Sequence, residues 1–336
     1  MARRVTLADV SKAAGVGIAT VSRALAAEPH PDVSAATRER IRSVADELGY
    51  RPSVTARILR NGGYRALSVI VPDDLWGWWE PVVVSAFHAA DERGYHVLVH
   101  PIAGQQGGAA GVIAALANIP TDGILIFGST TDPGVKDAAD ALRLPIVAID
   151  DALKDTILPT ISVDNVQGAR MAVEHLVNQG RRSIAYVGSA GDAAFSSDRE
   201  QGYREAVAAA GLPVDDALVV HCTDSENESL VTFPEFDAFL AAHPEIDAIF
   251  CEFDLMAAPV LRTLRRAGRT VPDDIALIGF DDERAAQLVD PPLTTIRQPY
   301  EEMGALAVAT LVDRANTTGA AERILVTPTL KRRQSA

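Results

Sequence analysis

From Ala66 onwards, short apolar runs that no charged residue interrupts alternate with stretches of helical periodicity. Strands of this composition are typically buried on both faces, as in a parallel sheet that helices cover. The runs that we predict to be strands are 67–71, 96–99, 124–127, 146–149, 183–187, 217–221, 248–251 and 276–278. The predicted helices between them include 82–93, 166–179, 200–210 and 256–267. The region is long for a single unit of this kind, so we predict two α/β subdomains.

The composition excludes several classes of protein. With 48% hydrophobic and 23% charged residues, the 336-residue chain is neither disordered nor collagen-like. Its apolar runs fall well short of the roughly 20 residues that span a bilayer. No apolar stretch follows the basic start at Met1, so no secretory signal is recognised and we expect a cytoplasmic protein. Cys222 and Cys251 form neither a metal-binding spacing nor a disulfide framework, so we expect two buried free thiols. We also expect neither a metal nor a cofactor.

The net charge of −14 argues by itself against a nucleic-acid partner, but the charge is unevenly distributed. Residues 1–63 hold ten Lys and Arg and six Asp and Glu, a net charge of +4, whereas the rest of the chain has a net charge of −18. This asymmetry suggests a small module that faces a polyanion and is attached to an acidic body. A chance bias of the surface would give the same numbers, so the pattern within these residues has to decide.

Two short helices joined by a tight turn are predicted near the N-terminus. Thr6 begins a capping-box pattern, and apolar residues then recur at helical spacing. The sequence Gly15-Val16-Gly17 interrupts this pattern, and a second helix is expected from Ile18 to about Ala26. Two helices joined in this way form a helix-turn-helix unit. A third helix, capped by Ser34, completes a three-helix headpiece.

The second of these helices has two different faces. Val21 and Ala24 lie on the arc expected to pack inside, and the opposite arc is free to meet DNA bases. That outer arc consists of Ile18, Ala19, Ser22 and Arg23. An Arg that bonds guanine O6 and N7 is worth about 1–3 kcal/mol of discrimination. We therefore expect Arg23 to carry most of the direct readout, with a solvated helix charge as the alternative.

Residues 51–63 can be either a plain linker or a short helix. Pro52 followed by the cap-like Ser53 can open one or two helical turns, which Gly62 and Gly63 end. A helix this short is marginal in water by itself. We expect it to form only where DNA and a partner subunit hold it.

Together these motifs resemble the DNA-binding headpiece of the LacI/GalR family of bacterial transcription regulators. The resemblance rests on Val5-Thr6-Leu7-Ala8-Asp9-Val10, Ala14-Gly15-Val16, Ala19-Thr20-Val21-Ser22-Arg23, Val33-Ser34 and Tyr50-x-Pro52. It implies a helix-turn-helix headpiece at 1–50, a hinge helix and linker at 51–63, and a palindromic double-stranded DNA operator. Gly17 departs from the family's usual Ser, and residues 28–32 lengthen the loop before the third helix.

The resemblance also implies which residues contact DNA. Ile18, Ala19 and Arg23 would read the major groove. The residues that would contact phosphates through hydroxyls or backbone N–H groups are Thr6, Gly17, Thr20, Ser22, Ser34 and Thr37. Leu59, beside Ala56, falls where the family inserts a Leu into the minor groove, and an apolar wedge of this kind kinks the duplex. The alternative for Leu59 is a buried contact of the linker.

The resemblance extends through the body of the chain. It is carried by Val163-Asp164-Asn165-x-x-Gly168, Ile278-Gly279-Phe280-Asp281-Asp282, Pro292-Leu293-Thr294-Thr295-Ile296-Arg297-Gln298 and Leu330-Lys331-Arg332. The family's body is similar to periplasmic sugar-binding proteins, with a small ligand between two α/β subdomains that contain parallel sheets. This implies an N-terminal effector-binding subdomain of 64–162 and 293–322, and a C-terminal one of 163–292 and 323–336.

The three Trp residues of the chain follow the first predicted strand. Trp76, Trp78 and Trp79 lie there together with Asp73 and Asp74. Flat indole faces suit the C–H faces of sugar rings. Core filling is the ordinary alternative for any one Trp. Three of them in one loop at a strand end favour contact with a ligand.

A second group of candidate effector contacts comes from the resemblance. Arg199 and Asp281 align with the family's ligand-binding Arg and Asp, and Asp150 ends another predicted strand. Carboxylate and guanidinium groups suit vicinal hydroxyls. Phe253 stands where many relatives carry an Asn, so the hydroxyl pattern read here should differ. The alternative for the charged residues is an ion-pair network that braces the subdomains.

The implied function is that of a sequence-specific DNA-binding transcriptional regulator of carbohydrate uptake or metabolism genes. A sugar effector between the subdomains would set its operator affinity, and repression is the family's usual outcome. Two like headpieces are needed to read a two-fold operator, so a homodimer is implied.

Two other functions were weighed. An enzyme on the same scaffold would draw on Asp73 and Asp74 with His88, or on Asp281 and Asp282 with Arg199. No nucleophile elbow, P-loop or metal cluster accompanies these residues, so we expect no catalysis. A solute-binding protein for transport would share the body but would need export and has no use for the headpiece.

Overall fold

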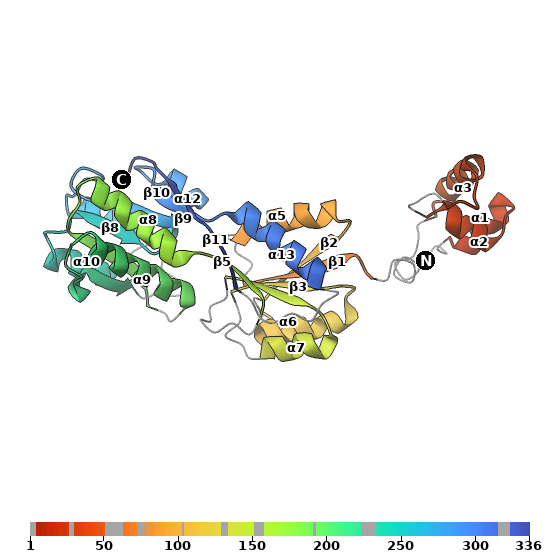
Figure 1. Cartoon of the computed structure of the whole chain (residues 1–336), viewed down its shortest axis with the longest axis horizontal. Coiled ribbons are helices and arrows are strands. Elements are labelled where there is room, and N and C mark those ends of the chain that lie inside the picture. The colour runs from red at the N-terminus through yellow and green to blue at the C-terminus, as the bar shows by residue number, and fades with distance from the viewer. Residues whose placement is uncertain are drawn as a thin grey trace. The chain divides into compact units, whose positions relative to one another are not determined.

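In the computed structural model, the chain forms two units, Met1–Arg65 and Ala66–Ala336 (Figure 1). The residues that the structure describes are 5–26, 30–50, 63–72, 77, 79–102, 104–128, 134–150, 158–190, 193–222, 233–314 and 323–336. The predicted hinge helix, with Ala56 and Leu59, lies outside them. We describe the two units separately.

The first unit is the predicted three-helix headpiece. Its helices are α1 (Leu7–Ala14), α2 (Ile18–Ala24) and α3 (Ala35–Glu47). Apolar side chains at helical spacing form one small core, which includes Val10, Val21, Ala24 and Ile41. The helix-turn-helix prediction is therefore confirmed, although α2 ends two residues before the expected Ala26.

The second unit contains two subdomains, each with a six-stranded sheet. In the N-terminal subdomain the strand order is β11-β5-β4-β3-β1-β2, and every pairing is parallel. The strands are β1 (Ala66–Val71), β2 (His96–Pro101), β3 (Ile124–Phe127), β4 (Ile146–Ile149), β5 (Thr160–Val163) and β11 (Arg323–Val326).

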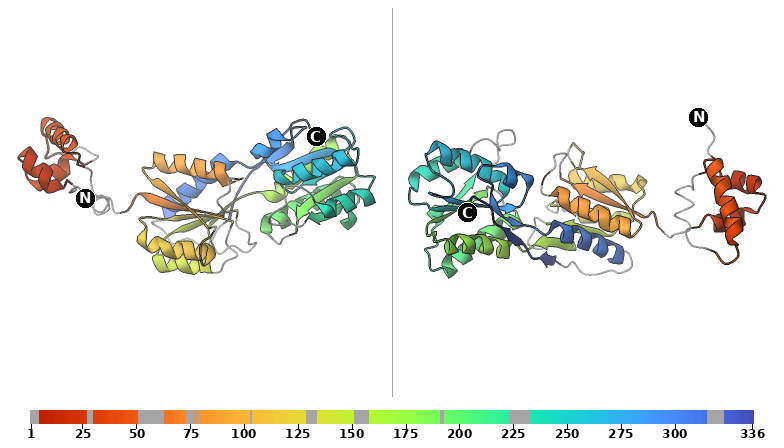
Figure 2. Two further views of the ribbon diagram at one scale, coloured as in Figure 1. Left: turned by 180° about the vertical axis from the view of Figure 1, so that it is seen from behind. Right: turned by 90° about the horizontal axis from the view of Figure 1, so that it is seen from above.

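Helices cover both faces of this sheet. Figures 1 and 2 show α5 and α13 together on one face, and α6 and α7 on the other. Their bounds are α5 (Trp79–Glu92), α6 (Gly108–Ala115), α7 (Gly134–Leu142) and α13 (Tyr300–Arg314), with a short 3₁₀ turn at η1 (Leu116–Asn118). The helices bury the apolar residues of β1, β3, β4 and β5, as the unbroken apolar runs predict, whereas the edge strands β2 and β11 stay partly exposed.

In the C-terminal subdomain the strand order is β12-β10-β9-β8-β6-β7, and only the pairing of β12 with β10 is antiparallel. The strands are β6 (Ile184–Ser189), β7 (Val219–Cys222), β8 (Ala248–Cys251), β9 (Ala276–Asp281), β10 (Thr294–Arg297) and β12 (Thr329–Lys331). The helical segments are α8 (Asn165–Asn178), α9 (Ala194–Ala209), η2 (Asp216–Leu218), α10 (Pro234–Ala242), α11 (Asp254–Arg266) and α12 (Arg284–Leu288). Helices α8 and α9 pack against each other, while α10 and α11 contribute to a separate apolar cluster.

The chain passes between the subdomains three times, after β5, after β10 and after β11. The first passage follows the end of β5 at Val163. The two returns were expected near 292 and 323, and both positions are wrong. Strand β10 pairs with β9 of the C-terminal sheet, and β11 pairs with β5 of the N-terminal sheet. Each of these two strands belongs to the sheet of the subdomain that the chain is about to leave. The chain therefore changes subdomain after the strand and not before it.

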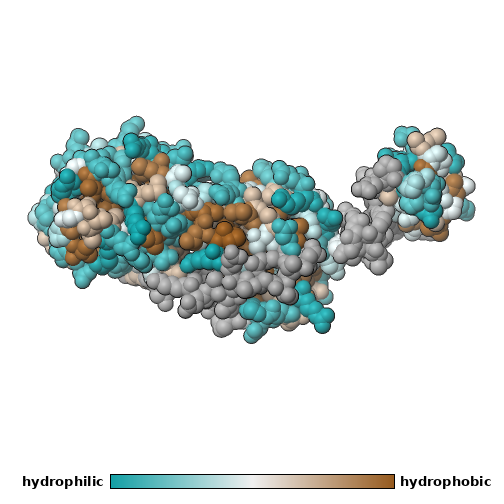
Figure 3. Space-filling model, viewed as in Figure 1, coloured by the Kyte–Doolittle hydropathy of each residue, from teal (hydrophilic) through white to brown (hydrophobic). Residues whose placement is uncertain are grey.

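The outer surface of the described chain is largely hydrophilic, with an apolar area near the middle of the body in the view of Figure 3. None of the described helices is both long enough and apolar enough to cross a membrane.

Candidate functional site

The turn between α1 and α2 fixes how the headpiece presents α2. Thr6 caps α1, since the Asp9 backbone N–H donates to Thr6 Oγ1 at 3.3 Å and the Thr6 backbone N–H donates to Asp9 Oδ2 at 2.8 Å. Gly15 ends α1 with φ +64°, a left-handed conformation that favours glycine. Ser11 Oγ then donates to the carbonyl oxygen of Val16 at 2.6 Å and closes the turn.

Helix α2 has the two faces that its sequence predicts. Val21 and Ala24 are fully buried, while Ala19 and Arg23 are exposed and Ile18 retains 53% of its surface. An exposed apolar side chain of this kind can contact a thymine methyl group in the major groove. Ser22 and Thr20 are half-buried, and Gly17 forms the exposed N-terminal cap of the helix.

Arg23 has a carboxylate beside it. Its Nη1 atom lies 3.6 Å from Oδ2 of Asp32, and both side chains are well exposed. Asp32 belongs to the loop whose length departs from the family pattern, and its backbone N–H donates to Nδ1 of His30 at 3.2 Å. The predicted base-reading guanidinium is thus held on one side by a charge of the headpiece itself.

The hydroxyls predicted to meet phosphates at the start of α3 bond to each other. Ser34 Oγ donates to Thr37 Oγ1 at 2.8 Å, and the Thr37 backbone N–H donates to Ser34 Oγ at 3.2 Å. Ser34 therefore caps α3 as predicted. Both hydroxyls lie at the N-terminal end of α3. The backbone N–H groups at such a helix end attract anions.

A cavity of about 200 Å³ lies between the two subdomains of the body. Asp150 enters it from the end of β4 in the N-terminal subdomain, and Gln298 follows β10 where the chain crosses over. The remaining described lining residues come from the C-terminal subdomain: Phe195, Arg199, Phe253, Leu255, Asp281 and Glu283. Ligands of open α/β sheets bind at the carboxyl ends of strands, which is where these residues lie.

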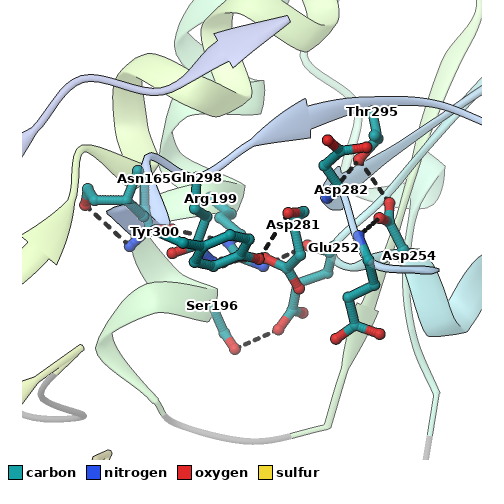
Figure 4. A network of polar contacts seen from close by, with 12 residues as sticks. Asn165, Ser196, Arg199, Glu252, Asp254, Asp281, Asp282, Thr295, Gln298 and Tyr300 are labelled. Carbon is teal, nitrogen blue, oxygen red and sulfur yellow. Dashed lines mark hydrogen bonds and ion pairs between the residues drawn. The ribbon is translucent and has the colours of Figure 1, made fainter. Parts of the chain in front are cut away.

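Arg199 is fixed in this cavity by three different acceptors (Figure 4). Its Nε donates to Asn165 Oδ1 at 2.8 Å, Nη1 donates to the carbonyl oxygen of Glu252 at 2.7 Å, and Nη2 donates to Asp281 Oδ1 at 3.1 Å. The guanidinium carbon also lies 3.7 Å from the centroid of the Phe280 ring. The group is almost completely buried, so its orientation is set before any ligand arrives.

Glycine on α8 makes room for the aromatic ring beneath Arg199. A Cβ atom at Gly168 would lie 2.6 Å from Phe280, closer than packed atoms can approach. Helix α9, which carries Arg199, approaches α8 equally closely, because a Cβ at Gly202 would lie 2.3 Å from the carbonyl oxygen of Val166. The family motif that contains Gly168 therefore has a steric reason in this chain.

Asp281 joins the ends of both subdomains. Gln298 Nε2 donates to its Oδ1 at 2.7 Å, and the hydroxyl of Tyr300, the first residue of α13, donates to its backbone carbonyl at 2.6 Å. Asp281 adopts φ +108°, an uncommon conformation for a residue with a side chain. Sequence reasoning missed Gln298 as a site residue, although it is the polar residue that directly follows β10.

A buried carboxylate beside the cavity, that of Asp254, connects the elements that carry the lining residues. Asp254 accepts from Thr295 Oγ1 at 2.6 Å and from the backbone N–H of Glu283 at 2.8 Å. Burial, together with the nearby Asp281, raises the pKa of Asp254 well above its ordinary value. Thr295 and Glu283 thereby tie β10 and the start of α12 to α11.

Asp150 is the least satisfied polar group of the cavity. It is 5% exposed, and its Oδ1 atom finds no hydrogen-bond partner among the described residues. Burial raises the pKa of Asp150 to about 6, in spite of the opposing attraction of Arg199. Its backbone has φ +47°, again in the left-handed region. Of the predicted ion-pair network, the pair of Arg199 and Asp281 is present, and both partners belong to the C-terminal subdomain.

The predicted Trp cluster is only partly described. Asp73, Asp74, Trp76 and Trp78 lie outside the described residues. Trp79 begins α5 and is 6% exposed, with its ring centroid 6.3 Å from that of Phe127. It belongs to the core of the body and does not line the described cavity, so the core alternative accounts for its contacts.

Sequence reasoning found four of the eight described lining residues and missed the rest. Phe195, Leu255 and Glu283 carry no motif of their own. They reach the cavity only because their helices begin at its rim. No group of His, Cys, Asp and Glu in the described part of the chain is arranged to hold a metal ion.

Comparisons with known proteins agree with both units. The family model "Bacterial regulatory proteins, lacI family" matches residues 6–53, and the model "Periplasmic binding protein-like domain" matches residues 173–336. The HTH-type transcriptional regulator CelR of Thermobifida fusca is 33% identical over 320 residues, which cover 93% of this chain and 92% of CelR. The chain belongs to the LacI family of bacterial regulatory proteins. It is therefore a bacterial regulatory protein of this family.

Other relatives extend the same comparison. The HTH-type transcriptional repressor CytR of Escherichia coli (strain K12) is 32% identical, with 92% of this chain and 89% of CytR covered. A solved "transcriptional regulator CelR-cellobiose complex" superposes with a TM-score of 0.73 at 30% identity, covering 99% of this chain and 100% of that chain. The Lac repressor dimer bound to operator and the anti-inducer ONPF has the same fold, with a TM-score of 0.82 at 24% identity and 99% of each chain covered.

Proposed function

We propose that the chain is a repressor of carbohydrate uptake or metabolism genes, which binds a palindromic operator through α2 and is controlled by a sugar. The outer face of α2 supports the DNA-binding role, because Ile18, Ala19 and Arg23 are exposed together on it. The proposed phosphate contacts are Thr6, Gly17, Thr20, Ser22, Ser34 and Thr37. Minor-groove contacts by Ala56 and Leu59 remain predictions.

The proposed effector site is the cavity between the subdomains. The observation that carries this proposal is the buried Oδ1 atom of Asp150, an acceptor with no donor among the described residues, in a cavity that a ligand can enter. Arg199, Asp281 and Phe253 line the same cavity, as expected for effector contacts. The relative CelR was solved as a complex with cellobiose, which supports a carbohydrate as the ligand class. Contacts from Asp73, Asp74, Trp76 and Trp78 remain predictions.

A homodimer is proposed because one headpiece reads only half of a two-fold operator. On α5, Val84 and Phe87 are exposed to 47% and 52%, although both are large and apolar. A second copy of the chain is the partner that would cover them.

The effector acts by changing the balance between two arrangements of the subdomains. Three chain passages join them, and Asp150 and Asp281 face one cavity from opposite subdomains. A ligand that bonds to both favours the arrangement in which both are within reach. It can change operator affinity only by the difference between its affinities for the two arrangements.

The experiment that tests this function is operator binding by the full-length protein with and without sugar. Footprinting of the protein's own promoter region should reveal a symmetric protected site. Fluorescence anisotropy should show an affinity that falls steeply with salt, since phosphate contacts release counterions. An effector should change this affinity by about 5- to 150-fold. A flat salt dependence, or no symmetric site at any salt concentration, would contradict the proposal.

A further inference from the structure

Two acceptor atoms in the cavity have no donor in the part of the chain that the structure describes. Asp150 Oδ1 and Gln298 Oε1 are both buried without a hydrogen-bond partner among the described residues, and Gln298 is only 1% exposed. The amide nitrogen of Gln298 already donates to Asp281, so the amide oxygen is the atom of this group that can accept from a ligand. Buried acceptors are rarely left without a donor in native proteins. A ligand that supplies O–H or N–H groups would complete both.

The cation of the cavity is already committed to protein groups. Arg199 is the one Lys or Arg among the described lining residues. Three of its N–H groups donate to Asn165, to Glu252 and to Asp281, and its ring-facing side is covered by Phe280. Its charge is compensated by Asp281 at 3.1 Å. An anionic ligand would have to compete with these acceptors for it.

The charge of the described lining is negative. Among these residues, Asp150, Asp281 and Glu283 carry three carboxylates against the single guanidinium of Arg199, a formal charge of −2. A bound anion would therefore meet a net negative charge on these residues.

Building on the proposed effector role, we infer that the cavity selects an uncharged or cationic ligand rich in hydroxyl or amine donors and rejects phosphorylated and carboxylated ones. Phe195, Phe253 and Leu255 supply an apolar wall for the C–H face of a sugar ring. Asp150 and Gln298 accept from its donors, and the excess of carboxylates repels an added anion. A phosphorylated sugar should bind about 100-fold more weakly, or worse, than its neutral counterpart, because like charges in contact are strongly unfavourable.

The test compares sugars that differ only in charge. Full-length protein is titrated calorimetrically with glucose, galactose and cellobiose, and with glucosamine, galactosamine, glucose 6-phosphate and galactose 6-phosphate. We expect binding by a neutral or amino sugar and little or none by the matching phosphate. Equal or tighter binding of the phosphate overturns the inference, and so does failure of every neutral and amino sugar in this panel to bind. The proposed regulatory function survives either failure if a phosphorylated sugar still changes operator affinity.

A pair of variants separates charge from shape. Glu283→Gln removes one carboxylate from the lining, while the contact to Asp254 comes from the Glu283 backbone and is retained. It should narrow the gap between neutral and phosphorylated sugar about tenfold. Asp313→Asn removes the same charge from an exposed position near the far end of α13, about 20 Å along the helix from Tyr300. The gap should stay unchanged there, and an equal change in both variants would show that net charge alone governs binding.

Discussion

Replacing Asp150 by Asn should stabilise the protein in the absence of effector. The carboxylate is buried, its Oδ1 atom has no donor within the described ranges, and burial raises its pKa from the ordinary 3.8 to about 6. A raised carboxyl pKa means that folding opposes ionisation. The penalty is absent below the ordinary pKa and complete above about pH 6, where the folded protein must carry the charge. From this rise the loss of unfolding free energy is about 3 kcal/mol near pH 7.5 and about 1.5 kcal/mol near pH 5.

The Asn variant keeps the shape and tolerates φ +47°, since Asn is among the residues that enter this region readily. For a unit of this size, about 1 kcal/mol corresponds to about 2 °C in Tm. We therefore expect the body of Asp150→Asn to melt about 6 °C higher than the native protein near pH 7.5 and about 3 °C higher near pH 5.

Scanning calorimetry of the full chain without sugar measures both values, with Asp313→Asn as the matched loss of an exposed carboxylate. The control should move Tm little at either pH. A variant that melts no higher than the native protein, or by the same increment at both pH values, would refute the reasoning. Its carboxylate would then have a partner in solution that compensates its burial.

Three further predictions concern other parts of the chain. Arg23→Ala should lower discrimination between operator and random DNA by about 1–3 kcal/mol, measured by competition anisotropy, whereas loss of a mere surface charge would weaken both equally. Asp32→Asn removes a charge that repels phosphates of any sequence and also removes the partner that holds Arg23 on one side, so it should tighten binding to random DNA more than to operator; Asp46→Asn, on the exposed side of α3, is the control that should not change the ratio. Gly202→Ala should destabilise the body by about 1–3 kcal/mol in calorimetry, since its Cβ would lie 2.3 Å from a backbone oxygen; an unchanged Tm would mean that α8 and α9 separate freely.

The sheet strands show what the sequence can and cannot predict. All eight predicted strands correspond to strands of the structure, because a run such as 124–127 is short, apolar at every position and bounded by Gly on both sides, as a strand buried on both faces is. The strands β5, β10, β11 and β12 were not predicted. They contain Thr, Ser, Arg or Lys, as in Thr160-Ile161-Ser162-Val163, and a strand this short gives no periodicity by itself.

The same limitation explains the wrong return crossings. A resemblance carried by residues 292–298 places the motif but does not say to which sheet its strand belongs. Only the pairing of β10 with β9 and of β11 with β5 decides that, and pairing between distant segments leaves no local signal.

Site residues that stand in a sequence motif could be predicted. Site residues that reach the cavity only through the packing of their helices could not. Arg199 and Asp281 stand in family motifs, and the structure brings them within 3.1 Å. The flat indole of Trp79 suits contact with a sugar ring, but at the start of α5 its side chain packs in the apolar core. Phe195 and Leu255 have no signal at all, since an apolar residue in the first turn of a helix is as often buried as it is exposed.

Two residues that line the cavity, Asp150 and Asp281, combine an uncommon backbone conformation with a buried carboxylate. A ligand in the cavity can therefore change the free energy of both. Asp150 at the N-terminal side and Asp281 at the C-terminal side both have a left-handed backbone and a buried carboxylate, at the ends of β4 and β9. Residues held in such conformations are stable only when their surroundings enforce them. In the proposed effector role, a donor-rich ligand would satisfy Asp150 only in the arrangement that also brings Asp281 within its reach. The free energy recovered there is absent from the other arrangement, and that difference is what a regulator needs to couple sugar binding to DNA binding. Removing the penalty with Asp150→Asn should therefore raise stability and reduce the response of operator binding to sugar in the same variant.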